Sequence, residues 1–301
     1  MLSGDVRRAR AGFTLVEMVV SLALTGIVLG MVGAISLRQQ RIFADLAEQT
    51  AAAARLREAS TILPIQLRAA SPLDIREARD TALEFRATIA SAVVCDTTAS
   101  ALVLAPVVDR DATLASIVVP IEAGDSVWLF TNDAAGERWR GFAIVAAGTR
   151  EPGRCGDAGP FLTNAQLHAS RVTVSISPSP ASAVGAPLRV TRPMRYSLYR
   201  AGDGAWYLGE RDWSNADARF NTIQPVAGPY LAPAAGGLVF RYIDSTGGAL
   251  TSPVIDRGAI AAVAVEMRSQ TANATRVLGS AATHGPRVDS TVLMVALRNR
   301  R

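Results

Sequence analysis

The chain has no lysine, only two histidines and few aromatic side chains among its 301 residues. All 31 basic residues are arginines, and nowhere do they form a dense stripe with interleaved aromatics, the pattern typical of nucleic-acid-binding surfaces. His168 and His284 lie far apart in polar stretches, and no G-x-S-x-G, H-E-x-x-H or phosphate-binding-loop motif is present. We therefore predict neither catalytic residues nor a nucleic-acid partner.

Metal-ligand patterns are also scarce. Asp109 and Asp111 supply oxygen ligands of the kind that Ca²⁺ prefers, but the sequence around them lacks the glycine and the twelfth-position glutamate of an EF-hand loop. We interpret this pair as a charged turn. The sequence thus predicts no metal site and no cofactor.

Apolar sequence, by contrast, is concentrated near the amino terminus. From Phe13 to Leu37 the chain offers 25 consecutive positions in which Glu17 is the only ionisable side chain. A helix of that length spans roughly 37 Å at about 1.5 Å per residue, enough to cross a hydrocarbon core of ~30 Å. Because a carboxylate inside such a segment costs about 2.5–3.5 kcal/mol, Glu17 needs a partner or a purpose.

The residues before this run set its orientation. Arg7, Arg8 and Arg10 stand against a single acid, Asp5, and by the positive-inside rule they hold residues 1–12 in the cytoplasm. An ordinary secretory signal would end in an A-x-A-like cleavage site, and the apolar run has none at its end. We therefore expect a short basic leader and an apolar helix that stays with the mature protein.

The junction of leader and apolar run, Gly12-Phe13-Thr14-Leu15-Val16-Glu17, resembles the class III leader of type IV pilins and pseudopilins. The resemblance implies that a prepilin peptidase cuts between Gly12 and Phe13 and methylates the new amino terminus of Phe13. Glu17 would then be the fifth mature residue, where the family keeps its glutamate, and would pair with the methylated amino group of a neighbouring subunit. The alternative is a plain single-pass anchor in which Glu17 snorkels to the membrane interface.

The helix is expected to run beyond the membrane segment (residues 13–37) over residues 38–70. Pro64 should kink or end it, and Ser71-Pro72 is the latest stop. An amphipathic stripe at spacings of 4, 7, 3, 7 and 4 residues predicts packing against the protein's own sheet. Its members are Ile42, Leu46, Ala53, Leu56, Leu63 and Leu67.

Residues 71–301 contain short β-type segments separated by turn residues, which predicts mainly antiparallel sheet. Together with the helix, this predicts an α+β, pilin-like fold. Asp203-Gly204 predicts a hairpin turn, and Asp244–Gly248 a second one. The Pro- and Ser-rich segment 177–187 is expected to be a loop that separates either two sheets of one domain or two small lobes, and we favour one domain. The expected strands are residues 82–86, 92–95, 101–104, 116–119, 126–130, 139–145, 171–176, 195–199, 206–208, 238–242, 262–267 and 291–297.

The only two cysteines, Cys95 and Cys155, fall in the region that this topology places outside the cytoplasm. An oxidising compartment and an even count favour a disulfide between them. Closing that loop of ~60 residues would stabilise the fold by about 4 kcal/mol in the chain-entropy model. Two unpaired buried thiols are the alternative.

A second resemblance covers about half of the exported region. Arg192–Arg200, followed by Trp206-Tyr-Leu, is similar to the aromatic hairpin of PilW-like minor pilins and J-type minor pseudopilins. Gly236–Asp244 and Ile260–Arg268 are similar to later strands of those proteins. The resemblance implies a structural subunit in the tip or priming complex of a type IV pilus or of a type II secretion pseudopilus.

Either assignment implies the same partners and location. The partners are the prepilin peptidase, other minor pilins or pseudopilins, the major pilin and the inner membrane, which the chain crosses once with residues 71–301 in the periplasm. An assembled filament would reach the cell surface. From a different class, the alternative is a membrane-anchored periplasmic enzyme or ligand-binding protein that uses a pilin-like export segment. A deep polar pocket with strongly shifted titratable groups would favour that alternative.

Overall fold

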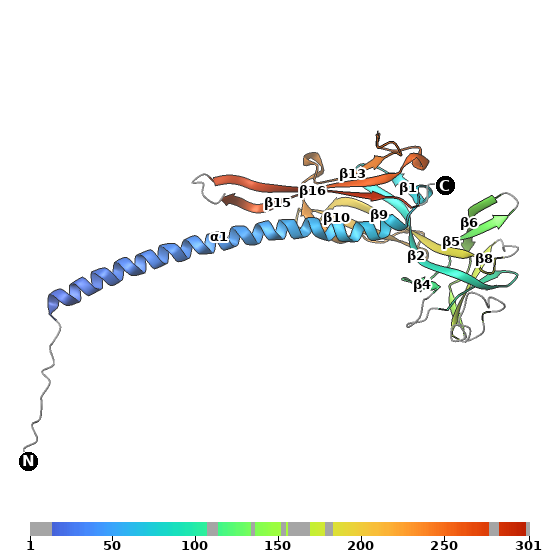
Figure 1. Cartoon of the computed structure of the whole chain (residues 1–301), viewed down its shortest axis with the longest axis horizontal. Helices are drawn as coiled ribbons and strands as arrows, with labels where there is room; N and C mark the ends of the chain where they lie inside the picture. Colours follow the sequence, from blue (N-terminus) through green and yellow to red (C-terminus); the bar gives the residue numbers. More distant parts are fainter. Residues whose placement is uncertain are drawn as a thin grey trace, which may run out of the picture. The chain divides into compact units, whose positions relative to one another are not determined.

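The computed structural model of the chain describes residues 14–106, 114–133, 136–151, 155, 169–177, 183–276 and 283–298. The chain divides into two compact units, Met1–Ala51 with Thr271–Arg287, and Ala52–Gln270 with Val288–Arg301. Helix α1 (Leu15–Ala69) begins in the first unit and ends in the second, and every described strand follows it in the chain (Figure 1). One long helix followed by a mainly antiparallel β-rich region confirms the predicted α+β, pilin-like fold.

The strands and short 3₁₀ helices follow in chain order. They are η1 (Pro72–Asp74), β1 (Ile75–Ala78), β2 (Ala82–Thr97), β3 (Ala101–Leu104), β4 (Ala115–Ile117), β5 (Ser126–Asp133), β6 (Gly136–Ile144), β7 (Thr149–Glu151), β8 (Arg171–Ser177), β9 (Pro187–Arg200), β10 (Trp206–Ser214), β11 (Arg219–Phe220), β12 (Gln224–Tyr230), η2 (Pro233–Ala235), β13 (Leu238–Ile243), β14 (Ala249–Leu250), η3 (Arg257–Ala259), β15 (Ala262–Arg276) and β16 (Thr283–Ala296).

One face of the carboxyl-terminal part of α1 is buried in the protein. The buried side chains are Ala52, Leu56, Ala59, Leu63 and Leu67, at spacings of 4, 3, 4 and 4 residues, which keeps them on one side of an α-helix. The helix therefore contributes an apolar stripe to the core of the second unit, as the amphipathic pattern predicts.

The predicted stripe is wrong at Leu46 and Ala53, whereas its first member, Ile42, is half-buried. Leu46 is 47% exposed, and Ala53 is only half-buried, because Ala52 occupies the core-facing position four residues before Leu56. Leu46 also belongs to the other compact unit. The predicted members Leu46 and Ala53 are seven residues apart, and a gap of that length does not distinguish Ala52 from Ala53 as the residue that faces the core.

Pro64 does not end the helix. Helix α1 continues through this residue to Ala69, two residues before Ser71-Pro72. A proline lacks an N–H, so the carbonyl of Ser60 loses its helical donor. Pro64 is itself buried, and its ring adds apolar contact on the core side.

The larger sheet has twelve strands, with the order β1-β2-β3-β8-β6-β5-β9-β10-β11 and with β4, β7 and β12 paired beside β2, β8 and β10. Strands β9 and β10 form the predicted hairpin: Arg200 pairs with Trp206, and Gly204 has a φ of +82° that a residue with a Cβ rarely adopts. Because β8 and β9 belong to one sheet, segment 177–187 does not divide two sheets. Its residues 178–182 lie outside the described part of the chain.

The smaller sheet has the order β14-β13-β15-β16. Its β13–β14 hairpin contains the second predicted turn, in which the Asp244 carboxylate accepts the backbone N–H groups of Thr246 and Gly248, each at 2.8 Å. Gly247 has a φ of +88° in this turn. The turn chemistry read from the sequence is therefore confirmed at both hairpins.

Two hydrophobic cores lie along the long strands β2 and β9. The first is enclosed by α1, both sheets and the aromatic side chains of Phe85, Tyr196 and Tyr242. The second is enclosed by the other halves of β2 and β9 together with β3, β5, β6 and β8. The β2–β9 register shifts between Thr88 and Ala90, at the passage from one core to the other.

Candidate functional site

The start of helix α1 holds the sequence features that point most directly to function. Thr14 precedes the helix and its carbonyl oxygen accepts the N–H of Met18, the first intrahelical hydrogen bond. The Glu17 carboxylate accepts the backbone N–H and the hydroxyl of Thr14 through Oε2, both at 2.9 Å, while the N–H of Glu17 donates to Thr14 Oγ1 at 3.3 Å. This reciprocal arrangement is a capping box, which satisfies donors that a helix start otherwise leaves free.

The cap uses only half of the carboxylate. Both bonds from Thr14 end on Oε2, and Oε1 accepts no hydrogen bond from any described residue. No arginine among the described residues forms an ion pair with Glu17. The second oxygen is thus open to a donor from outside the described part of the chain.

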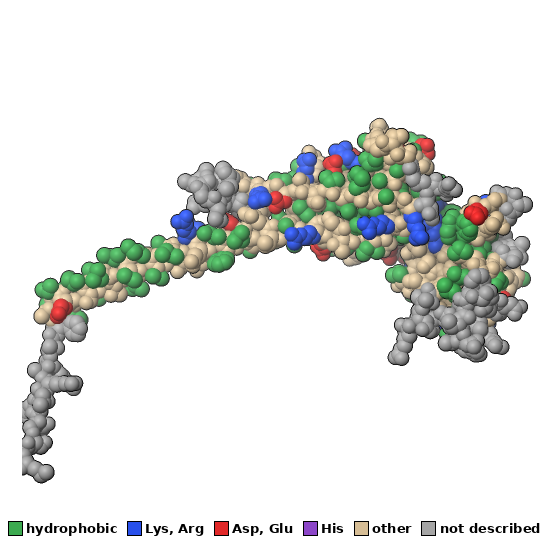
Figure 2. Space-filling model, in the orientation of Figure 1, with side chains coloured by type: hydrophobic (Ala, Val, Ile, Leu, Met, Phe, Trp, Pro, Cys, Tyr) green, Lys and Arg blue, Asp and Glu red, His purple; other side chains and the backbone are tan. Residues whose placement is uncertain are grey.

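The helix surface that follows is apolar on all sides and uncovered. The large side chains from Leu15 to Leu37 are between 50% and 81% exposed, and this helix contains an 18-residue window apolar enough to cross a membrane. Figure 2 shows apolar side chains along this part of the helix. The window has none of its residues buried within the chain. A helix that is apolar all round requires lipid or other apolar helices around it.

Three glycines in this segment have no internal packing role. A Cβ at Gly26, Gly30 or Gly33 would meet nothing within 4 Å. Glycine within a helix costs up to about 1 kcal/mol relative to alanine. Packing within the described part of the chain therefore gives no reason for these residues, and close approach of helices in lipid is one setting in which glycine is favourable.

Residues around this site carry a recognised sequence motif. Residues 7–33 match the prokaryotic N-terminal methylation motif. This match supports the type IV pilin and pseudopilin family. The matched residues include Gly12 and Phe13, both outside the described residues, together with Thr14 and Glu17. No curated protein and no solved structure matches the chain.

The motif is also the basis for three broader statements. It implies processing by a prepilin peptidase and assembly with other pilins in a membrane system. Together with the long apolar helix it is consistent with a membrane-anchored, single-pass protein. It indicates a structural protein more than an enzyme.

Thr14 is the residue of this site whose role the sequence reasoning missed. The pattern Ser/Thr-x-x-Glu at the start of an apolar helical run is a signature of a capping box, and Thr14-Leu-Val-Glu17 has this form. The capping signal is therefore present in the sequence, beside the electrostatic one that singles out Glu17.

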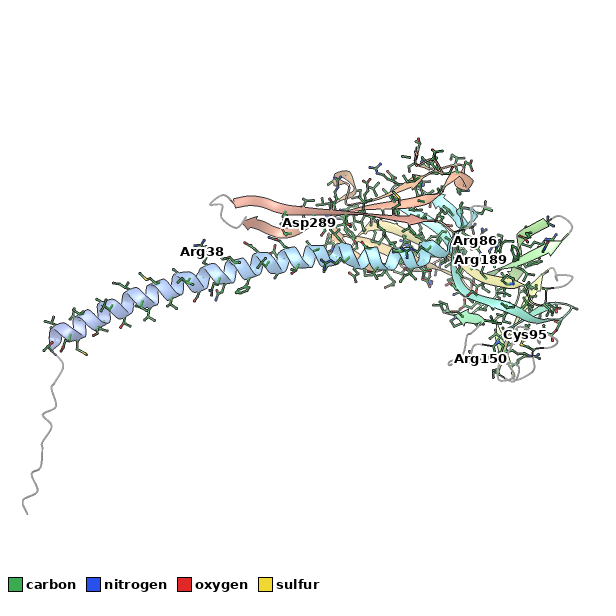
Figure 3. All side chains as sticks on the ribbon, in the orientation of Figure 1. Arg38, Arg86, Cys95, Arg150, Arg189 and Asp289 are labelled. Atoms are coloured by element: carbon green, nitrogen blue, oxygen red, sulfur yellow. A yellow bond between two sulfur atoms is a disulfide. The ribbon has the colours of Figure 1, made fainter. Side chains whose placement is uncertain are left out.

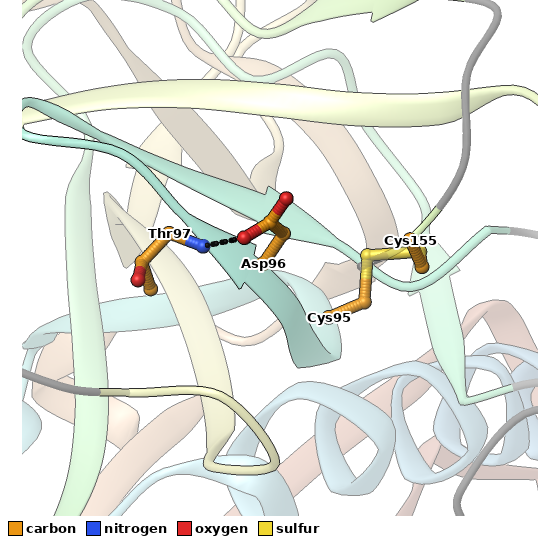
Figure 4. Close-up of a disulfide and its surroundings, with 4 residues drawn as sticks. All are labelled: Cys95, Asp96, Thr97 and Cys155. Carbon is orange, nitrogen blue, oxygen red and sulfur yellow. Dashed lines mark hydrogen bonds between the residues drawn. A yellow bond between two sulfur atoms is a disulfide. The ribbon is translucent and has the colours of Figure 1, made fainter. Parts of the chain in front are cut away.

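The cysteines are joined in the structure. Cys95 in β2 and Cys155 form a disulfide with a Cα–Cα distance of 5.2 Å, closing a loop of 60 residues (Figure 4). Both side chains are buried, and they form a small cluster with Val103 and Ala105. The loop contains β3 to β7, so the bridge fastens one end of the second core.

A buried ion pair attaches β9 to the residue before β5. Asp125 is 1% exposed and accepts two bonds from Arg192, at 2.7 Å from Nε and 2.8 Å from Nη2. The N–H of Glu122 and the side-chain amide of Asn215 also donate to it at 2.8 Å. The hydrogen bond to Asp125 raises the pKa of Arg192, so the guanidinium stays charged. Because Asp125 accepts hydrogen bonds from three residues of the chain itself, we interpret this carboxylate as a structural group.

Within the residues that the structure describes, no other ionisable candidate from the sequence joins a reactive centre. His168, Asp109 and Asp111 lie outside the described residues, and His284 is in β16. Burial raises the pKa of Tyr196 and Tyr242, which keeps both phenols neutral. Within the described ranges, no group of three or more His, Cys, Asp or Glu side chains could hold a metal ion.

Proposed function

We propose that the chain is a minor pilin or minor pseudopilin, a structural subunit in the tip or priming complex of a type IV pilus or of a type II secretion pseudopilus. The observation that carries this proposal is the uncovered apolar helix from Leu15 to Leu37 within and after a methylation motif. Such a surface is stable in lipid or against other apolar helices, the two environments that a filament subunit occupies in turn.

Maturation would convert the precursor to a subunit ready for assembly. The prepilin peptidase cuts between Gly12 and Phe13 and methylates the new amino group of Phe13. Cleavage removes residues 1–12 with their three arginines and leaves the Thr14–Glu17 cap intact, because both capping residues lie after the cut.

Glu17 then sets the axial register of the subunit. Its Oε2 is occupied by Thr14, and its Oε1 is open to the methylated ammonium group of the neighbouring subunit's Phe13. In the low-dielectric core of a filament, an isolated carboxylate and an isolated ammonium group are both costly, so the arrangement that pairs them is favoured over shifted ones. The helix-capping bonds hold the carboxylate in place for this pairing.

The same features suggest the topology. The leader stays in the cytoplasm, residues 13–37 cross the inner membrane, and residues 71–301 form a periplasmic domain after the helical continuation over 38–70. The disulfide Cys95–Cys155 is in keeping with an oxidising compartment such as the periplasm. The partners would be the peptidase, other minor subunits and the major pilin.

The subtype rests on resemblance in the globular region. The segment Arg192–Arg200 continues through the Asp203-Gly204 turn into β10, and Gly236–Asp244 contains β13. This hairpin and strand support a PilW-like minor pilin or a J-type minor pseudopilin. Retention of Glu17 favours a position just below the tip, because the family's K-type tip subunit commonly lacks this glutamate.

The proposal is tested by replacing Glu17 with alanine in the producing cell and measuring incorporation into sheared filaments. We expect normal cleavage and membrane insertion but at least tenfold less incorporation. Ser36→Ala, another polar-to-apolar change in the same apolar segment, is the matched control and should assemble normally. Wild-type incorporation of Glu17→Ala would refute the register role.

A further inference from the structure

The second compact unit carries an arginine that forms no ion pair with any described carboxylate. Arg86 lies in β2 with its guanidinium over the indole of Trp128, at 5.2 Å from Cζ to the ring centroid. Its Nη1 reaches the carbonyl oxygen of Leu73 only at 3.5 Å. No carboxylate among the described residues forms an ion pair with Arg86.

The arginines around Arg86 are, in contrast, already paired. Arg189, which lies beside Arg86 in Figure 3, binds Asp74 through two bonds of 2.7 and 3.1 Å. Arg76 and Arg195 flank Glu84 at 3.5 and 3.6 Å. Burial, and next the nearby charge of Arg76, lower the pKa of Arg86, with Asp74 acting in the opposite direction. Arg86 is therefore the surplus positive charge of this cluster.

Arg86 opens onto a polar cleft of about 290 Å³. The walls combine two arginines, one glutamate, two hydroxyl groups and two apolar rings. The lining residues are Arg76, Glu84, Arg86, Gly124, Ser126, Thr191, Pro193 and Trp213. The charges of the wall sum to +1, which matches one singly charged anion.

Neighbouring residues hold Trp128, the ring against which the Arg86 guanidinium packs, in place. Trp128 donates from Nε1 to Thr191 Oγ1 at 3.1 Å, and Arg189 lies 5.8 Å from the same ring. Strand β6 allows the indole to lie close because residue 141 is glycine: a Cβ there would be 3.2 Å from the ring. A guanidinium held against an aromatic face loses less freedom when it binds.

We propose that this cleft binds a carboxylate group, with Arg86 as its principal ligand and Arg76 as a second cation. A guanidinium offers five N–H donors in a planar fork that fits the two oxygens of a carboxylate, and most of those of Arg86 are unused. The aliphatic part of the ligand lies against Pro193 and Trp213. The cleft holds one short acidic side chain or a small carboxylic acid, and it is too small for a polymer. This inference does not depend on the role proposed for Glu17.

The test uses the full-length chain in detergent micelles and follows the fluorescence of its tryptophans, two of which, Trp128 and Trp213, adjoin Arg86 or the cleft. The probes are the end-blocked tripeptide Ala-Glu-Ala, its neutral counterpart Ala-Gln-Ala, butyrate and inorganic phosphate. We expect saturable binding of Ala-Glu-Ala and none of Ala-Gln-Ala. If butyrate binds as tightly as the tripeptide, the ligand is a small carboxylic acid. If butyrate binds more weakly, the ligand is an acidic side chain held in a peptide. Either result supports the proposal.

Variants assign the binding to the cleft. Arg86→Gln should weaken Ala-Glu-Ala binding at least tenfold, and Arg86→Lys should be intermediate, because lysine keeps the charge without the fork. Arg76→Gln, at a side chain that is 50% exposed, should weaken it about threefold without risk to folding. Arg219→Gln, at an exposed position in β11, is the control and should bind as the wild type does. Undiminished binding in Arg86→Gln, no binding of either carboxylate by the wild type, or phosphate binding at equal or lower concentration would overturn the proposal.

Discussion

Thr14 and Glu17 cap the first turn of helix α1 for each other, through two bonds of 2.9 Å to one oxygen of the glutamate and one bond of 3.3 Å back to the threonine hydroxyl. Glu17 therefore has a local role that does not depend on a neighbouring subunit. The cap orients the carboxylate along the start of the helix and leaves its second oxygen available. Local capping and pairing between subunits can use the same side chain.

Removing the threonine hydroxyl separates these roles. In Thr14→Val the backbone N–H still donates to Glu17, but the hydroxyl bonds are lost, at a cost of about 1 kcal/mol to the helix start. We expect faster hydrogen exchange of the first-turn amides in micelles, whereas Thr14→Ser should retain wild-type protection. Equal protection in Thr14→Val and the wild type would contradict the capping role.

The buried stripe of the helix predicts a large difference between two nearby positions. Leu63 is fully buried in the first core, while Ile65 is 69% exposed. Leu63→Ala should lower the free energy of unfolding by about 2–5 kcal/mol, because it removes buried methyl groups and leaves a cavity. Ile65→Ala should change it by no more than about 0.5 kcal/mol. Denaturant unfolding followed by tryptophan fluorescence measures both, and similar losses would show that the stripe is misplaced.

The disulfide predicts a stability that depends on the redox state. Opening the 60-residue loop between Cys95 and Cys155 should lower the free energy of unfolding by about 4 kcal/mol in the chain-entropy model. The wild type should lose this stability in dithiothreitol, and the Cys95→Ser/Cys155→Ser variant should be equally unstable with and without the reductant. A wild type unaffected by complete reduction would contradict the contribution of the bridge.

The ion pair between Asp125 and Arg192 predicts a strong effect of a nearly isosteric change. Asp125→Asn removes the buried counter-charge of Arg192 and leaves it only the half-exposed Glu122, 3.2 Å away, so it should cost about 3 kcal/mol of unfolding free energy. Asp212→Asn, at an exposed position in β10, should cost far less. Denaturant unfolding curves of the two variants measure both losses of unfolding free energy. Equal losses would mean that Asp125 does not form the ion pair with Arg192.

The sequence predicts the parts of this fold that local chemistry determines. The apolar run contains only one ionisable residue, and the two turns contain glycines at positions of positive φ, so helix and hairpins are readable from short patterns. The sequence predicts strand β2 as two runs, 82–86 and 92–95, but the break between them marks a change of core and not a turn. The sequence does not predict β1, β7, β11 and β14, since strands of two to four residues are defined by the neighbours they pair with. It does not predict β12 (Gln224–Tyr230) because two prolines and a glycine interrupt its β pattern.

The functional residues also divide into those that a linear pattern predicts and those that depend on tertiary contacts. Gly12, Phe13 and Glu17 lie within the N-terminal methylation motif, which is a linear pattern, and Cys95 and Cys155 allow only one pairing. The cleft at Arg86 could not be anticipated. It depends on the β2–β9 register, which sets Arg86 opposite Pro193, and on the bond that pairs the neighbouring Arg189 with Asp74. Such a site arises from contacts between residues far apart in the chain.

The most direct test of the account is the identity of the mature amino terminus. Intact-mass and amino-terminal peptide analysis of the protein purified from its native membrane should find a chain that begins at Phe13 with a methylated amino group. The Gly12→Leu variant should accumulate as the uncut precursor. A native protein that begins at Met1 without methylation, or a Gly12→Leu variant that is processed normally, would contradict the account.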